Sequence, residues 1–271
     1  MAPVFACTLL ISHPPHGQVD AARAASHLGL SAPDLAVKAN YPIPEIWAAE
    51  EDEARARTLA SAIGEAGIKL ALASGQALAD IPPHDPVQSV SVTELGVVLL
   101  AEGRRVELAW DARLLGVYYT TRAGGGAKEQ PSRGVRERGA ACDAPFFDLF
   151  VPGGDALGRF AALANLTEFA GLGESGTLSP AGRVARFAQL CEERFPAGQV
   201  DRRLLNMQIR HWPPPATLVA PHLVRKGFSF SSAGLAELLG KLGPALAEPS
   251  HCEFASRLVY LTWRFGEEAG S

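Results

Sequence analysis

The sequence predicts an α+β fold, in which an N-terminal βααβαβ domain is followed by an antiparallel β-meander domain with packed C-terminal helices. Short apolar runs alternate with helical spacing through residue 80, and the stretch at 80–86 holds three prolines. Period-two alternation starts directly after that stretch. We therefore expect one domain at 1–80 and a second at 87–271, the second interrupted by an insertion at 122–143.

Local signals support each element of the first domain. We expect strands at 4–11, 43–47 and 68–72, and helices at 19–28, 31–39 and 50–64. Asp20 and Ser31 are suited to begin the first two helices, and Pro33 fits the first turn of the second. The acidic run 50–53 opens the third helix, where carboxylates complement the helix dipole. We prefer this interpretation to a site for a cation or a basic partner.

Several short motifs in this domain match one family. They are His27-Leu28-Gly29-Leu30-Ser31, Tyr41-Pro42 and Glu65-Ala66-Gly67-Ile68. With these motifs, the segment resembles the C-terminal domain of the bacterial ribosomal stalk protein, and the resemblance implies its βααβαβ fold. In that family, translation factors dock on a lysine-rich face of the first two helices. The matching stretches here, 20–23 and 31–34, contain no lysine, so the ribosomal role is not expected. The same fold presents peptides to a protease in other bacterial adaptors, but no residue set here marks that pocket.

The second domain is expected to begin with a β-meander. Residues 90–93 and 106–110 alternate, 95–100 are apolar, and 102–105 form a turn between strands. The segment 110–117 resembles a stretch of bacterial pleckstrin-homology-like barrels in which the chain re-enters the sheet from a corner. We expect 146–151 to complete the sheet that begins at Val90. Helices follow at 180–195, from 231 to 242 and at 252–267, and the meander is the surface on which we expect them to pack.

Composition excludes several classes of protein. The chain has 271 residues, a net charge of −4 and an isoelectric point near 6.0, which does not suit a surface built throughout for phosphate backbones or anionic lipid. No stretch approaches the ~20 apolar residues of a membrane span, and the N-terminus lacks the basic start of a signal peptide. The chain has 25 lysines and arginines, mostly arginines, which indicates a GC-rich bacterial genome. We expect a cytoplasmic protein.

Three motifs could carry chemistry, and each has a structural interpretation that we favour. Residues 171–176 satisfy Gly-x-Gly-x-x-Gly, but the helix after them is delayed, which favours a turn over a dinucleotide site. His13 and His16 could form half of a metal site with His27 or His84, although loop histidines usually face solvent. His251 and Cys252 are adjacent on one helix and cannot face each other as a nucleophile and its base.

The cysteines carry no recognisable motif. Cys7, Cys142, Cys191 and Cys252 lie far apart and form no Cys-x-x-Cys pair. This spacing excludes a zinc knuckle or a thioredoxin-like motif, and we expect buried free thiols.

Two segments are candidate binding surfaces. The glycine-rich insertion is read as a mobile loop whose cations could contact phosphate or an acidic partner. These cations are Arg122, Lys128, Arg133, Arg136 and Arg138. The second candidate is Arg210-His211-Trp212, which stands beside three prolines and suits an exposed interaction edge.

Taken together, these patterns predict a non-enzymatic cytoplasmic adaptor or regulatory module that binds another protein. We expect no cofactor, no metal and no catalytic residue. One alternative is an enzyme whose site is assembled from distant polar residues of the second domain, namely Asp143, Asp148, His211 and His222. The other is a weak nucleic-acid binder that acts through the basic loop.

Overall fold

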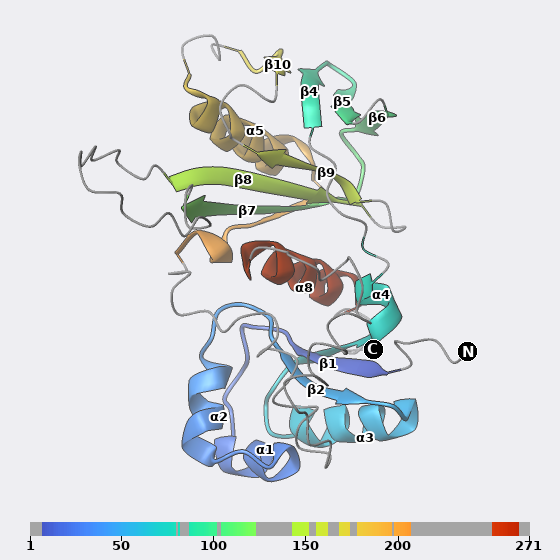
Figure 1. The fold of residues 1–271 in the computed structure, drawn as a ribbon, viewed down its shortest axis with the longest axis vertical. Coiled ribbons are helices and arrows are strands. Elements are labelled where there is room, and N and C mark those ends of the chain that lie inside the picture. The colour runs from blue at the N-terminus through green and yellow to red at the C-terminus, as the bar shows by residue number, and fades with distance from the viewer. Residues whose placement is uncertain are drawn as a thin grey trace, which may run out of the picture. The chain divides into compact units, whose positions relative to one another are not determined.

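The computed structural model describes residues 7–79, 81, 87–101, 104–122, 143–151, 156–161, 168–173, 178–196, 198–206 and 251–265. The fold is α+β, with open antiparallel and mixed sheets (Figure 1). The chain divides into two compact units. The first comprises Met1–Pro83, Phe150–Ala156 and Asn206–Ser271, and the second comprises His84–Leu149 and Leu157–Leu205.

The first unit follows the predicted βααβαβ order. Its elements are β1 (Thr8–Ser12), α1 (Ala21–Leu28), α2 (Ala32–Ala39), β2 (Ile46–Glu50), α3 (Glu53–Gly64), β3 (Leu70–Ser74) and the short α4 (Gly75–Ala79). β1 lies in the centre of a three-stranded sheet and pairs antiparallel with both β2 and β3. The predicted caps are formed, because the side chains of Asp20 and Ser31 accept hydrogen bonds from backbone N–H groups of α1 and α2.

β1 is buried on both faces. Leu10 belongs to the core formed with α1, α2 and α3, whereas Leu9 and Ile11 point to the opposite face because side chains alternate along a strand. Leu9 is only 4% exposed and Ile11 is fully buried. The opposite face must therefore be covered by another element.

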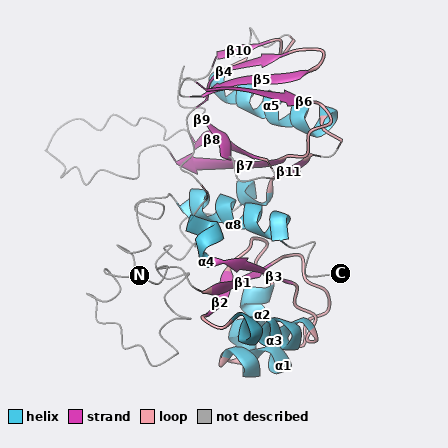
Figure 2. Cartoon of the chain, turned by 90° about the vertical axis from the view of Figure 1, so that its right-hand side faces the viewer, coloured by secondary structure: helices cyan, strands magenta, loops and turns pink. Residues whose placement is uncertain are grey.

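That element is α8 (His251–Phe265), which contacts β1, β3 and α4. Figure 2 shows α1–α3 on one side of the sheet and α8 on the other. Phe254 and Leu258 of α8 are fully buried. We expected this last helix to pack on the β-meander, as part of a domain spanning 87–271. That expectation is wrong for α8, which packs on the sheet of the first unit. The doubly buried β1 supplies the apolar surface that α8 requires.

The second unit contains two four-stranded sheets. The first has the order β10-β4-β5-β6, and the second has the order β11-β7-β8-β9. Their strands are β4 (Val87–Val92), β5 (Gly96–Ala101), β6 (Arg104–Ala109), β7 (Leu115–Arg122), β8 (Asp143–Phe150), β9 (Ala156–Ala161), β10 (Glu168–Ala170) and β11 (Gln199–Asp201). The meander β4-β5-β6 is antiparallel as predicted. The expectation that 146–151 completes this sheet is wrong, because the chain turns after β6 and β8 pairs within the second sheet.

The helix α5 (Pro180–Arg194) joins the two sheets through one aromatic side chain. Phe187 lies edge to face with Phe147 of β8, with 5.8 Å between centroids, and its ring is also 5.9 Å from that of Phe169 in β10. Glycine is required at position 116 of β7, since a Cβ there would lie 2.3 Å from the Phe147 ring. These aromatic rings thus form part of the core of the second unit.

Candidate binding groove in the second unit

A groove of about 550 Å³ opens beside α5 in the second unit. It is formed by four segments that are distant in sequence: the β4–β5 hairpin, the corner after β6, the turn after β10 and one side of α5. Its lining residues are Val92, Thr93, Glu94, Trp110, Gly171, Leu172, Gly173, Arg186, Leu190 and Arg194. The volume falls in the range of sites that accept a small molecule or a few residues of a peptide.

Trp110 is held in place from three sides. Its indole Nε1–H donates a hydrogen bond to the backbone oxygen of Glu94 at 2.9 Å, which ties the corner after β6 to the hairpin. Its ring lies edge to face with Phe195, with 4.9 Å between centroids. The guanidinium of Arg194 lies over the ring, 5.7 Å from its centroid. The indole therefore presents a fixed aromatic surface to the groove.

The side of α5 that faces the groove carries two cations. Arg186 uses Nη1 to donate to both carboxylate oxygens of Glu193, at 3.2 and 3.3 Å. Arg194 makes no ion pair with any carboxylate of the residues that the structure describes, and its side chain is exposed. The apolar floor of the groove is formed by Leu172 and Leu190, which are 6% and 7% exposed.

The turn after β10 shapes the far side of the groove. Gly171 has a φ of +77°, and a Cβ at this position would lie 2.4 Å from the backbone oxygen of Val92. β10 does pair in parallel with β4, but α5 begins only at Pro180, and it lines the groove from Arg186 onward rather than with its N-terminus. A dinucleotide fingerprint places the pyrophosphate at the helix N-terminus, so this geometry supports the structural turn.

The charged and polar groups of the lining are two arginines, one glutamate and one threonine. Thr93 is engaged within its hairpin, where Oγ1 donates to the oxygen of Gly96 at 3.0 Å and accepts from its N–H at 3.2 Å. Glu94 is the one carboxylate among the lining residues, and these residues include no histidine, cysteine or lysine. The arrangement suits recognition of an anion next to an apolar group.

Most of the predicted binding residues cannot be compared with this groove. Arg122 is the last residue of β7. The others, Lys128, Arg133, Arg136, Arg138, Arg210, His211 and Trp212, lie outside the described residues. The sequence patterns did not predict the groove. The available signals were Trp110, at the corner resembling the pleckstrin-homology-like barrels, and Gly171, which was assigned to a turn.

The residues proposed for the enzyme alternative are only partly described. Asp148 is fully buried in β8, and one carboxylate oxygen accepts a hydrogen bond from the Tyr119 hydroxyl at 3.0 Å. Asp143 begins β8, and His211 and His222 lie outside the described residues.

His16 differs from the expected solvent-facing residue. Its Nδ1 accepts a hydrogen bond from the Lys69 N–H at 3.2 Å, and its ring is 5.8 Å from the ring of Trp47. Burial lowers the pKa of His16, and the nearby His13 and Lys69 lower it further. Within the described part of the chain, no three His, Cys, Asp or Glu side chains are arranged to hold a metal, and His84 lies outside that part.

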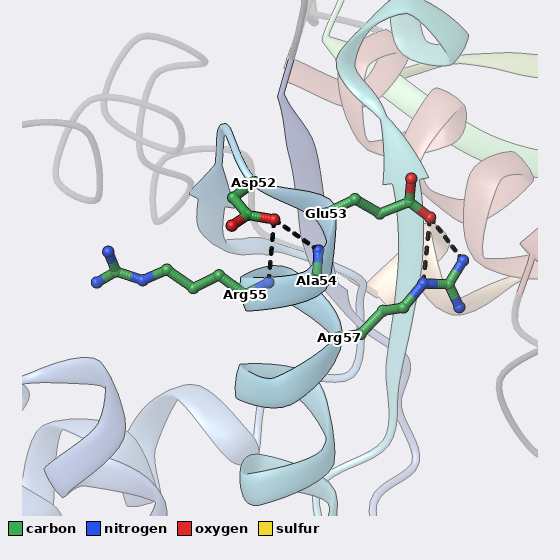
Figure 3. Close-up of polar contacts among 5 residues, drawn as sticks. All are labelled: Asp52, Glu53, Ala54, Arg55 and Arg57. Atoms are coloured by element: carbon green, nitrogen blue, oxygen red, sulfur yellow. Dashed lines mark hydrogen bonds and ion pairs between the residues drawn. The ribbon is translucent and has the colours of Figure 1, made fainter.

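Two residues of the acidic run 50–53, Asp52 and Glu53, stabilise the start of α3, as Figure 3 shows. Asp52 is the N-cap of α3 and accepts from the N–H groups of Ala54 and Arg55 at 2.8 and 3.4 Å. Glu53 pairs with Arg57 one turn later, at 2.6 Å. The expected helix start at residue 50 is wrong, because Glu50 is the last residue of β2, where it pairs with Arg55.

The two cysteines with described side chains carry free thiols. Cys191 is buried in α5, and burial raises the pKa of its thiol far above the usual range. Cys7 is half-buried. The side chains of Cys142 and Cys252 are not among those described.

Comparisons with known proteins do not assign the chain to a family. No family model matches it, and no curated protein and no solved structure shows significant similarity. None of the described helices combines the length and apolar character needed to span a membrane.

Proposed function

We propose that the chain is a cytoplasmic adaptor or regulatory module that binds another protein through the groove beside α5. The observation that carries this proposal is the pairing of Arg194 with Trp110 over an apolar floor. Tryptophan and arginine are the residue types that most often dominate the binding energy of protein interfaces. Here the indole is held by a hydrogen bond and two ring contacts, so little of its conformational entropy is lost when a partner binds.

The surface next to the groove also suits a protein partner. Leu95 directly follows Glu94 in the β4–β5 hairpin and is 85% exposed, an unusual exposure for a leucine. Leu178, near the start of α5, is 36% exposed. Apolar side chains beside an aromatic and cationic centre are typical of a contact surface that a partner covers.

The two family resemblances add support. The ribosomal stalk domain and the pleckstrin-homology-like barrel, which two segments of the sequence resemble, are folds that usually present surfaces to other molecules. The element order of the first unit is the one that the stalk resemblance implies. Fold alone does not specify function, so the proposal depends on the groove.

Site-specific photocrosslinking in cells of the source organism tests the proposal. A photoreactive benzoylphenylalanine at Leu95 should yield a discrete crosslinked protein, and Arg194→Glu should remove it. The same crosslinker at Val37, a 63% exposed residue of α2 in the first unit, is the matched control for an exposed apolar site. Circular dichroism and the thermal midpoint establish that the Arg194→Glu variant is folded.

Other outcomes contradict the proposal in distinguishable ways. A crosslink at Leu95 that survives Arg194→Glu shows that the groove does not form the contact. A crosslinked protein at Val37 but none at Leu95 would show that the partner binds the first unit instead of the groove. A crosslink to RNA or DNA instead of protein favours the nucleic-acid alternative.

A further inference from the structure

We propose that the groove binds an extended peptide segment in which two carboxylates flank an apolar side chain, in the order acid-x-apolar-x-acid. This inference rests on the proposed function, because it specifies the chemistry of the partner segment that the groove beside α5 recognises. It follows from the spacing, the charge and the burial of three residues of α5: Arg186, Leu190 and Arg194.

The spacing of these residues matches an extended peptide. Arg186, Leu190 and Arg194 follow one another at intervals of four, and all three line the groove. At ~1.5 Å of rise per residue, the outer two Cα atoms lie about 12 Å apart along the helix. An extended chain advances ~3.3 Å per residue, so the first and fifth residues of a segment lie about 13 Å apart. The side chains of residues one, three and five also share one face of such a segment.

The charge of the groove selects acidic residues for the two outer positions. Arg194 makes no ion pair with a described carboxylate, and its guanidinium lies over the ring of Trp110. Arg186 uses only Nη1 in its contact with Glu193, so Nε and Nη2 are not engaged by that contact. A guanidinium is suited to a carboxylate, which accepts two parallel N–H bonds from it. Because Glu94 is the one acidic lining residue, cations exceed anions in the lining.

The apolar floor selects the central residue. Leu172 and Leu190 line the groove together with the two cations, Leu190 stands midway between them along α5, and the residual exposure of each leucine is below one tenth. A leucine-sized side chain at the third position of the segment would cover this floor and exclude water from the flanking ion pairs. Excluding water strengthens those pairs, because their charges then interact at a lower effective dielectric constant. A nucleic-acid backbone offers the anions but no apolar side chain, so it leaves the floor uncovered.

Fluorescence anisotropy with the purified 271-residue chain and defined peptides tests the inference. The probe is a fluorescein-labelled, amidated peptide with the sequence Gly-Glu-Ser-Leu-Ser-Glu-Gly. One control peptide has glutamine at both glutamate positions, and a second has the glutamates directly beside the leucine. We expect both controls to bind at least about fivefold more weakly, because each removes or misplaces charge-assisted hydrogen bonds.

Protein variants locate the peptide on α5. Arg186→Gln and Arg194→Gln should each weaken binding of the probe by about fivefold to tenfold. Arg183→Gln is the matched control, since Arg183 lies on the same helix, contacts the backbone oxygen of Leu178 and does not line the groove. It should leave the affinity unchanged. Replacing one peptide glutamate at a time, in combination with each arginine variant, gives double-mutant cycles that assign each carboxylate to its arginine.

Even if the probe binds, three results would overturn the inference. They are equal binding of the peptide with misplaced glutamates, equal weakening by Arg183→Gln, and displacement of the probe by a uridine decamer with the same sensitivity to Arg186→Gln and Arg194→Gln. If the probe does not bind while the Leu95 crosslink still depends on Arg194, the groove binds a protein segment of different chemistry. In that case this inference fails and the proposed function stands. If the crosslink also fails, both are wrong.

Discussion

The ring of Phe187 in α5 meets the ring of Phe147 in β8 edge to face, with an interplanar angle of 85°. Phe187 also lies beside Phe169 of β10, so a single side chain connects the helix to both sheets of the second unit. Edge-to-face aromatic pairs contribute stability beyond the area that they bury. The position of α5, and with it one side of the groove, depends on this contact.

Phe187→Ala should therefore destabilise the second unit by about 3–5 kcal/mol, because it leaves a cavity where both sheets meet the helix. Urea unfolding followed by circular dichroism measures the change. Gln189→Ala replaces an exposed residue of the same helix and should change the unfolding free energy by less than about 0.5 kcal/mol. Equal effects of the two substitutions would show that Phe187 does not hold the sheets together.

Gly116→Ala should destabilise the second unit through overpacking. The added Cβ would lie 2.3 Å from the ring of Phe147, so the ring or β7 must shift, at a cost of about 1–3 kcal/mol. Gly64→Ala is the matched control, since nothing lies within 4 Å of a Cβ at the last residue of α3. The free energy of unfolding measured in urea should fall for Gly116→Ala only, and a neutral Gly116→Ala would contradict the packing described.

The stability of the first unit should decrease with acidification because of His16. Its pKa in the folded chain lies below the ordinary value of 6.5, so the unfolded chain takes up the proton first as pH falls. The folded state is therefore at full stability above pH 6.5 and loses stability as pH falls toward the lowered pKa. Protonation of Nδ1 also removes the acceptor for the Lys69 N–H.

The urea midpoint measured between about pH 7.5 and 5 tests this prediction. His16→Gln should flatten the decrease, whereas His27→Gln, at an exposed position of α1, should leave it unchanged. If His16→Gln retains the full dependence on pH, another group is responsible for it.

Leu258→Ala should destabilise the first unit, although residue 258 is far from the first unit's strands in sequence. Leu258 is fully buried in α8, and its truncation should cost about 2–5 kcal/mol. Hydrogen exchange measured by mass spectrometry should show faster exchange in peptides that cover β1 and β3, the strands that α8 contacts. Arg264→Ala, at an exposed position of the same helix, is the control. Faster exchange confined to the strands of the second unit would refute the observed packing of α8.

The parts of the fold that the sequence predicts correctly depend on local signals. Ser31 begins α2 and Asp20 begins α1 because capping involves only neighbouring backbone N–H groups. The meander β4-β5-β6 is likewise recognisable from alternation and turns. The boundary of α3 was misplaced by three residues, because an acidic residue suits both a strand end, as at Glu50, and a first helical turn.

What could not be predicted depends on contacts between distant segments. Nothing in residues 251–265 indicates that their apolar side packs on β1 rather than on the meander, since both surfaces are apolar. The groove has the same difficulty, because its lining comes from four separate segments. Trp110 and Arg194 are each ordinary in the sequence, and only the fold places one over the other.

The covering of β1 by α8 also affects how the chain folds as it is synthesised. The strands of the first unit leave the ribosome early, but one face of their sheet stays exposed until residues 251–265 have emerged. The second unit lies between these segments in sequence and can therefore fold while the first is incomplete. During this interval, the uncovered side of β1 and β3 is an apolar surface that a chaperone would recognise.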